Sequence, residues 1–289
     1  MVSRFTPLLV SGAALALATV TACSPVEDDT TTSASPATVA DACPSGALTT
    51  VTSGKLTVGT DNPAYEPWFS DNKPDNGKGF ESAVAYQVAA RLGYPKDKVV
   101  WTPVTFNNAI APGPKKFDFD INQFSITDER KQAVDFSSPY YLVRQTVITT
   151  KKSKIAGAKS LADLAGAKLG AQVGTTSYQA ITDIIKPTTK PSVFNSNDDA
   201  KAALENGTVD GIVVDLPTAF YMTGAELKDG VIVGQLPQVG VPEQFGLVLD
   251  KGSKLTGCVS TVVDQLRQDG TLSALEKTWL SDAGAPELK

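Results

Sequence analysis

Hydrophobic and polar positions follow two periods along the chain, and these periods predict strands and helices in turn. Residues 55–60 alternate polar and apolar side chains, as a half-buried strand does. Apolar residues recur every four positions from Phe80 to Leu92 and stop before Gly93, which is typical of an amphipathic helix. Further strands are predicted over 99–104, 117–124, 147–150, 168–173, 211–214 and 246–250, and further helices over 160–166, from Thr176, over 198–206, at Pro217 and on both sides of Gly270. Strands that alternate with helices imply an α/β fold with largely parallel sheets.

The first 22 residues have the pattern of a signal peptide. A short apolar run from Pro7 to Leu17 follows Arg4, and it is shorter than the roughly 20 residues of a membrane span. The run ends at Val-Thr-Ala before Cys23, which resembles a bacterial lipobox. Cys23 would then carry lipid and become the first residue of the mature protein. The alternative is an ordinary secretory signal with an incidental cysteine.

Residues 23–42 are expected to be the lipidated Cys23 and a disordered linker. The stretch after Cys23 is rich in Ser, Thr, Ala, Asp and Glu and has no aromatic residue, so it cannot bury enough apolar surface to fold. The sequence has no second hydrophobic span, and the anchor would therefore be lipid alone. We expect the folded part to be held at the outer face of the cell membrane.

Composition excludes several classes of function. The formal net charge is −5, so no basic surface indicates nucleic acid. The chain has no histidine, which excludes histidine-based catalytic triads and histidine metal sites. Neither a Gly-x-Ser-x-Gly elbow nor a phosphate loop is present. We expect no cofactor, no metal and no catalytic residue.

Three cysteines have to be explained. If Cys23 carries lipid, Cys43 and Cys258 are left as a pair. Two remaining cysteines in an oxidising compartment usually form a disulfide. The alternative is two buried free thiols.

A long ordered motif carries a family resemblance. The run SITDERKQAVDFS, from Ser125 to Ser137, resembles the central motif of family 3 extracellular solute-binding proteins, the receptors for glutamine, for lysine, arginine and ornithine, and for histidine. Other landmarks agree, and these are Gly59-Thr60-Asp61 with Tyr65 and Pro67, Gly79-Phe80-Glu81, Gly174-Thr175-Thr176-Ser177 and Asp215-Leu216-Pro217. The resemblance extends from about residue 53 to residue 282.

The resemblance implies two α/β lobes that are joined by two crossing strands and close on a ligand. Lobe 1 would comprise residues 43–143 and 240–289, and lobe 2 residues 144–239. The chain would cross near 143–146 and return near 239–245. A disulfide between Cys43 and Cys258 would then lie within lobe 1. We expect a monomer.

The two charged ends of a free amino acid need opposite anchors. Arg130 is the candidate for the α-carboxylate, since a guanidinium presents a planar fork of donors. Thr175 and Thr176 would hold the same carboxylate at a strand-to-helix turn. The local alternatives are a solvated helix face for Arg130 and an ordinary turn for the threonines.

Asp215 is the candidate for the α-ammonium. It stands at a strand end, where open α/β sheets bind ligands, and the Ser125 hydroxyl and the Gln123 carbonyl would assist it. The local alternative for Asp215 is a helix cap.

The ligand side chain would lie between Tyr65 and Phe106, whose alternative role is core packing. Asp61 would point at its distal end, and Asn122 and Gln172 could add amide contacts. A carboxylate in that place favours an amine, guanidinium or amide group over an acidic one.

Two positions depart from the glutamine receptor, which has a lysine at Gln172 and a histidine at Val214. The pair Asp61 and Tyr65 resembles instead the receptors for cationic amino acids. We therefore expect a polar ligand with a basic or amide side chain.

The resemblance implies the substrate-binding component of an ABC importer, with the membrane permease as its partner. Two alternatives remain open. One is a ligand-sensing lipoprotein that signals to a separate partner, and the other is a dehydratase-like enzyme on the same scaffold.

Overall fold

The computed structural model describes residues 43, 48–280 and 284–289. The predicted signal peptide (1–22), the lipidation site Cys23 and the linker up to residue 42 lie outside the described residues.

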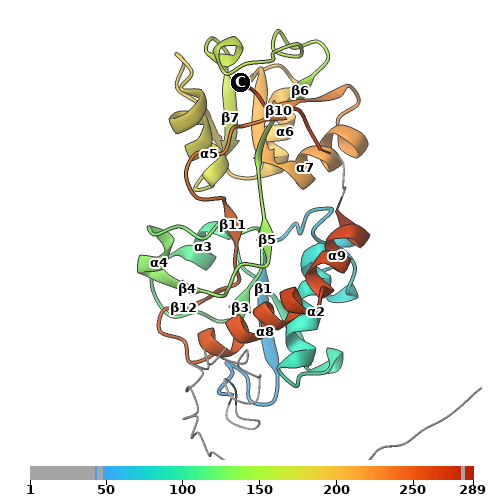
Figure 1. Cartoon of the computed structure of the whole chain (residues 1–289), viewed down its shortest axis with the longest axis vertical. Coiled ribbons are helices and arrows are strands. Elements are labelled where there is room, and N and C mark those ends of the chain that lie inside the picture. The colour runs from blue at the N-terminus through green and yellow to red at the C-terminus, as the bar shows by residue number, and fades with distance from the viewer. Residues whose placement is uncertain (1–42, 44–47, 281–283) are drawn as a thin grey trace, which may run out of the picture. The chain divides into compact units, whose positions relative to one another are not determined.

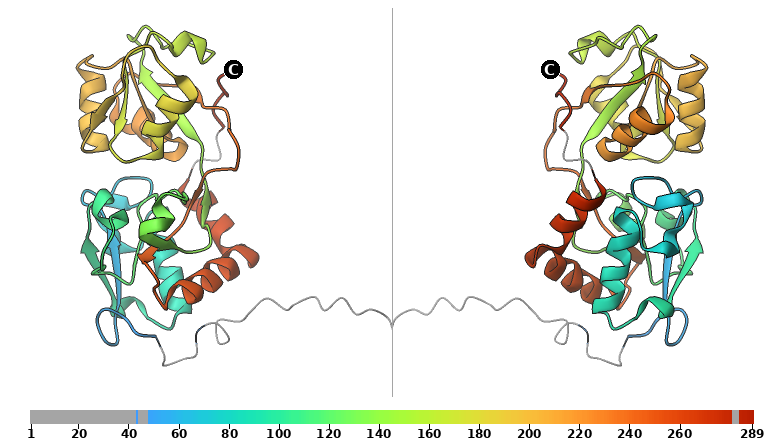
Figure 2. Two further views of the ribbon diagram at one scale, coloured as in Figure 1. Left: turned by 90° about the vertical axis from the view of Figure 1, so that its left-hand side faces the viewer. Right: turned by 90° about the vertical axis from the view of Figure 1, so that its right-hand side faces the viewer.

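The first lobe is built on a five-stranded sheet with the order β2-β1-β3-β12-β4 (Figure 1). Its strands are β1 (Leu56–Thr60), β2 (Val99–Pro103), β3 (Phe119–Asp120), β4 (Val134–Phe136) and β12 (Val248–Asp250). Its helices are α2 (Phe80–Arg91), α3 (Phe106–Ile110), α4 (Arg130–Ala133), α8 (Thr256–Gln268) and α9 (Thr271–Trp279). Helices α2, α8 and α9 contact one another and cover one face of the sheet (Figure 2).

The second lobe is built on another five-stranded sheet with the order β10-β6-β9-β7-β8. Its strands are β6 (Gln145–Thr150), β7 (Leu169–Gln172), β8 (Ser192–Phe194), β9 (Gly211–Asp215) and β10 (Gly230–Gln235). Its α-helices are α5 (Thr176–Ala180), α6 (Asn197–Glu205) and α7 (Leu216–Tyr221). Two apolar clusters, one around Val147 and Leu169 and one around Ile148 and Ile212, pack against this sheet.

Strand direction brings the ends of both sheets to one place. In each sheet four strands run in one direction, and the strand that arrives from the other lobe, β12 or β6, runs antiparallel to its neighbours. The crossing segments pair as β5 (Tyr141–Leu142) and β11 (Gln244–Phe245) between the two sheets (Figure 1). The two-lobed α/β fold expected from the sequence is confirmed.

Two predicted elements are shorter than expected. The strand predicted over 117–124 is reduced to β3, and Asp118 just before it turns its carboxylate to the backbone N–H groups of Val51 and Thr57. Gln123 has a left-handed backbone with φ of 49°, which ends the extended segment. The helix predicted after Ser160 is a single 3₁₀ turn over Ala162–Leu164.

A disulfide joins Cys43 to Cys258 in α8, with the two Cα atoms 5.3 Å apart. The expected pairing is therefore present. Both cysteines are buried in the core of the first lobe, so the bridge fastens the start of the folded part to a helix near its end.

The last residues of the chain pack with the second lobe. The amide of Leu288 donates to the Gln235 carbonyl of β10, and the Gln235 amide donates to the Pro286 carbonyl. Leu288 is buried beside Val233 and Leu236. We therefore assign residues 284–289 to the second lobe, whereas the expected boundary placed them in the first. The sequence does not predict this pairing, because it is made by backbone groups and no side-chain pattern marks it.

None of the helices within the described residues is long and apolar enough to cross a membrane.

Asp120 on β3 is a buried acid without a hydrogen-bond partner among the described residues. A Cβ on Gly59 of the neighbouring strand would meet Asp120 Oδ2 at 2.3 Å, so the carboxylate fits only beside a glycine. Burial raises the pKa of Asp120 well above its usual range, and the charges of Glu81 and Asp61 raise it further. A buried group that ionises without a partner destabilises the folded state.

The first prediction concerns Asp120→Asn. An acid whose pKa is higher in the folded than in the unfolded state stabilises the native state at pH values below the unfolded-state pKa. This contribution is lost as the pH rises through the folded-state pKa. We expect the free energy of unfolding of the variant, measured with urea, to match that of wild type at about pH 4. At about pH 8 it should exceed that of wild type by at least about 1 kcal/mol. Equal pH dependence in Asp120→Asn and wild type would contradict the prediction.

Candidate ligand-binding site

A cavity of about 40 Å³ lies where strand ends of the two lobes meet. It is lined by Asp61, Tyr65, Phe106, Asn122, Gln123, Gln172, Thr175, Thr176, Ser177, Asn197, Val214 and Asp215. All the predicted ligand residues except Ser125 and Arg130 are in this set. Ser125 lies directly beside it, with its Oγ 3.1 Å from Thr176 Oγ1. The fold therefore gathers residues from positions 61 to 215 in one place.

Arg130 is buried between the lobes and is not a solvated helix residue. The residue is 8% exposed, and the guanidinium donates to the Ser125 carbonyl at 2.7 Å and to the Gly174 carbonyl at 2.9 Å. The guanidinium also lies over the Phe106 ring, 5.3 Å from its centroid. Burial lowers the pKa of Arg130 to about 10, and the charges of Glu243 and Asp215 act against this change. The group remains a cation at neutral pH.

Asp215 ends β9 and precedes α7, but its side chain makes no capping hydrogen bond. Its Oδ1 accepts instead from Gln145 Nε2 at 2.8 Å. Burial raises the pKa of Asp215 well above the usual value, and the nearby charge of Glu243 raises it further. Asp215 is therefore a carboxylate in need of a cation rather than a helix cap.

The two threonines have different roles. The Thr175 hydroxyl donates to the Gln172 carbonyl at 2.7 Å and accepts from the Tyr178 amide at 3.3 Å, so it caps α5. The Thr176 hydroxyl donates to Glu243 Oε1 at 2.5 Å. Both hydroxyl protons are thus already bound within the protein.

The residues predicted for the ligand side chain also make structural contacts. The Tyr65 hydroxyl donates to Asp198 Oδ2 at 3.3 Å, and this bond crosses between the lobes. Burial and the charge of Asp198 raise the pKa of Tyr65. Phe106 stacks on Phe124 with ring centroids 4.8 Å apart, so it serves the core as well as the cavity wall.

Asp61 is fixed at the edge of the cavity by local bonds. Its Oδ1 accepts from the Asn62 amide at 2.7 Å, and its Oδ2 accepts from the Phe106 amide at 3.1 Å. Gln123 turns its side chain away toward the buried Glu81, which also accepts from the Gln123 amide. The Gln123 side chain is therefore used in holding the loop.

Sequence reasoning missed two polar residues of the crossing segments. Gln145 begins β6, and its Nε2 reaches both Asp215 and Glu243. Glu243 precedes β11 and accepts from Ser125 Oγ at 2.5 Å. The segment containing Glu243 could be recognised as a crossing from the resemblance, but no local pattern pairs it with residues about a hundred positions away.

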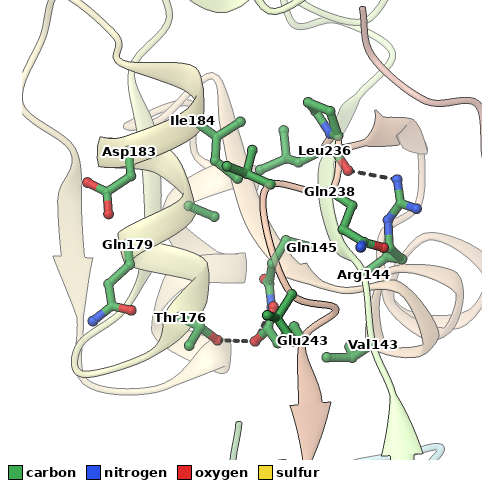
Figure 3. A pocket seen from close by; sticks show the side chains of 14 residues that line it. Val143, Arg144, Gln145, Thr176, Gln179, Asp183, Ile184, Leu236, Gln238 and Glu243 are labelled. Atoms are coloured by element: carbon green, nitrogen blue, oxygen red, sulfur yellow. Dashed lines mark hydrogen bonds between the residues drawn. The ribbon is translucent and has the colours of Figure 1, made fainter. Parts of the chain in front are cut away.

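A second cavity of about 300 Å³ lies on the side of the crossing segments (Figure 3). Gln179 and Asp183 line one side of it, and Leu236 and Gln238 line another. Thr176 lines both cavities.

Among residues 43, 48–280 and 284–289, no group of three or more acidic, cysteine or histidine side chains could hold a metal ion.

Residues 56–282 match the bacterial extracellular solute-binding proteins, family 3. The chain belongs to this family. It is 30% identical to the probable histidine-binding protein of Campylobacter jejuni over 231 residues, which cover 78% of this chain and 84% of the relative. It is 28% identical to the L-cystine-binding protein TcyJ of Escherichia coli over 230 residues, 78% of this chain and 82% of the relative.

Solved structures support the same assignment. An ancestral arginine-binding protein bound to arginine matches with a TM-score of 0.64 and 32% identity, over 79% of this chain and 99% of that one. The ancestral amino acid-binding protein AncCDT-1, a precursor of cyclohexadienyl dehydratase, matches with a TM-score of 0.64 and 33% identity, over 79% of this chain and 96% of that one. All of these relatives are named as binding proteins, and AncCDT-1 is also described as the precursor of an enzyme.

Proposed function

We propose that this protein binds a free amino acid with a polar, basic or amide side chain outside the cell and passes it to an ABC permease. The observation that carries the proposal is the buried Arg130. Among the described residues no carboxylate forms an ion pair with it, and its guanidinium donates to carbonyls only. A buried cation whose nearby acids, Glu243 and Asp215, form no ion pair with it can accept an anionic ligand group, and an α-carboxylate has the geometry for a guanidinium fork.

The opposite charge of the ligand has its own partner. Asp215 forms no ion pair among the described residues, and burial and the charge of Glu243 raise its pKa against the weaker opposing effect of Arg130. The α-ammonium of a ligand would supply Asp215 with a cation and would offset its repulsion by Glu243. Asp215 lines the cavity of about 40 Å³, and Arg130 lies next to it with its guanidinium on the Ser125 and Gly174 carbonyls, so a buried carboxylate and a buried cation are available for the two ends of a zwitterion.

Asp61 supports a basic or amide side chain. Its carboxylate is anchored at the cavity edge by two backbone amides, and an acidic ligand side chain would be repelled there. Relatives named for histidine, cystine and arginine support an amino acid without selecting one.

Binding without chemical turnover is the function that these residues support best. Anchors for both ends of a zwitterion require no reaction, and most of the named relatives are binding proteins. The dehydratase-like alternative is supported only by the relationship to AncCDT-1. The signalling alternative requires the same ligand and differs in the partner.

Delivery to a permease is proposed together with a lipid anchor at Cys23 and a position at the outer face of the membrane. The protein would act as a monomer on the linker of residues 23–42, with two lobes that close on the ligand. The support is the lipobox-like sequence at Cys23 and the membership of the family.

The second prediction concerns Arg130→Ala. Loss of one partner of a buried ion pair costs about 3–5 kcal/mol, so amino-acid affinity should fall by about two to four decades, as measured by calorimetry. Arg91→Ala is the matched control, because Arg91 pairs with Asp269 on the surface, and it should leave the affinity unchanged. Near-wild-type affinity in folded Arg130→Ala would refute the assignment.

The third prediction concerns selectivity at Asp61. Asp61→Asn keeps the shape of the side chain and removes its charge. A basic ligand should lose most of its affinity, since charge-assisted hydrogen bonds are about twice as strong as neutral ones. Glutamine should lose much less. The measurement is one calorimetric panel of lysine, arginine, glutamine, glutamate and alanine against both proteins, and an unchanged rank order would reassign Asp61 to a purely local role.

The fourth prediction concerns the anchor. Cys23→Ser should release the protein from membranes into the medium, because a single lipidated residue is the only hold proposed. Cell fractionation followed by immunoblotting measures this, with the wild-type protein as the reference. Retention of Cys23→Ser in salt-washed membranes would show that the anchor lies elsewhere.

A further inference from the structure

Glu243 receives donors from both lobes at once. Its Oε1 accepts from Ser125 Oγ of the first lobe and from Thr176 Oγ1 of the second, each at 2.5 Å. The amide of Gln145 donates to the same carboxylate at 3.1 and 3.2 Å. Figure 3 shows the bond from Thr176 and the Gln145 side chain next to Glu243. A carboxylate on the crossing segment therefore organises polar groups of both lobes.

The hydroxyl protons at this place can be assigned. A hydroxyl has one proton to donate and two lone pairs to accept with, and an ionised carboxylate only accepts. The contact between Ser125 Oγ and Thr176 Oγ1 is 3.1 Å, which is longer than the bond that each makes to Glu243. Both protons consequently point at Glu243. Thr176 lines the cavity and the Ser125 oxygen lies 3.1 Å from its hydroxyl, so both oxygens keep lone pairs at the edge of the cavity.

The Gln145 amide is oriented in the same network. Its Oε1 accepts from the Ser177 hydroxyl at 2.7 Å, so its Nε2 must face the carboxylates. Nε2 donates to Asp215 Oδ1 as well as to Glu243. This fixes one Asp215 oxygen and leaves the other for a ligand.

We infer that Glu243 is a positioning residue for the ligand ammonium, because it turns the Ser125 and Thr176 hydroxyls into acceptors beside Asp215. The inference rests on the proposed function and deepens it. It assigns the Thr176 hydroxyl to the ammonium end of the ligand, where acceptors are needed. The sequence alone assigns it to the carboxylate end, where a donor is needed. Two hydroxyl oxygens and one Asp215 oxygen match the three protons of an ammonium group.

Charge acts in the same direction as geometry. The charges whose fields reach Asp215 are those of Glu243, Glu81 and Arg130, and the largest is that of Glu243. Two neighbouring carboxylates disfavour an empty site and favour one that holds a cation. A neutral residue in place of Glu243 would keep a similar shape and lose this preference.

The test uses Glu243→Gln in the full chain and calorimetry with L-arginine and its 2-hydroxy analogue, which lacks the ammonium. We expect the variant to bind L-arginine at least about tenfold more weakly and the analogue with a much smaller change. Glu205→Gln, which removes one exposed charge at the end of α6, is the control for net charge and should change neither affinity. Equal losses for the two ligands, or no loss, would overturn the inference.

A ligand-free measurement separates this inference from the proposed function. The side-chain carboxyl carbon of Asp215 is followed by NMR as a function of pH. Removing the Glu243 charge should lower the pKa of Asp215, whereas a purely structural role would leave it unchanged. If wild type binds none of the common free amino acids, the proposed function and the ammonium role both fail. If wild type binds L-arginine while Asp215 titrates identically in Glu243→Gln, only the role of Glu243 fails.

Discussion

A buried guanidinium is the constraint on which the site depends. Arg130 gives its protons to one carbonyl of each lobe, and it can remain charged in a low-dielectric place only if such acceptors surround it. These two hydrogen bonds connect the loop after β3 to the loop after β7. The acidic groups nearby, Glu243 and Asp215, offset its charge without pairing with it. The site consequently holds a buried cation and buried carboxylates that form no ion pair with one another, which suits the two charged ends of a zwitterion.

Strand direction explains why so much of the site could be predicted from the sequence. Asp61 follows β1, Thr175 follows β7 and Asp215 ends β9, and the carboxyl ends of strands that run in one direction meet at one edge. The strand and helix periods therefore predicted an α/β fold and the strand ends, whereas the two lobes were implied by the family resemblance. The family motif around Arg130 supplied what periodicity alone lacks, namely which lobe each segment joins.

The parts that could not be predicted depend on contacts between distant segments. Glu243 reaches Ser125 across 118 positions and Gln145 across 98, and no local pattern links them. Asp120 fits the alternation of a strand, yet its burial beside Gly59 follows from the order of strands in the sheet. The Asp118 carboxylate, which lies just before β3, likewise accepts from backbone groups 61 and 67 positions away.

The two ends of the folded part are fastened to different lobes. Cys43 is bonded to α8 in the first lobe, whereas Leu288 is embedded in the core of the second. A tether that reaches the protein through Cys43 would therefore be attached to the first lobe and not to the second. A fluorophore attached at Lys289 would report on the second lobe and one attached beside Cys43 on the first. Energy transfer between this donor and acceptor would therefore measure any change in the distance between the lobes without a label in the cavity.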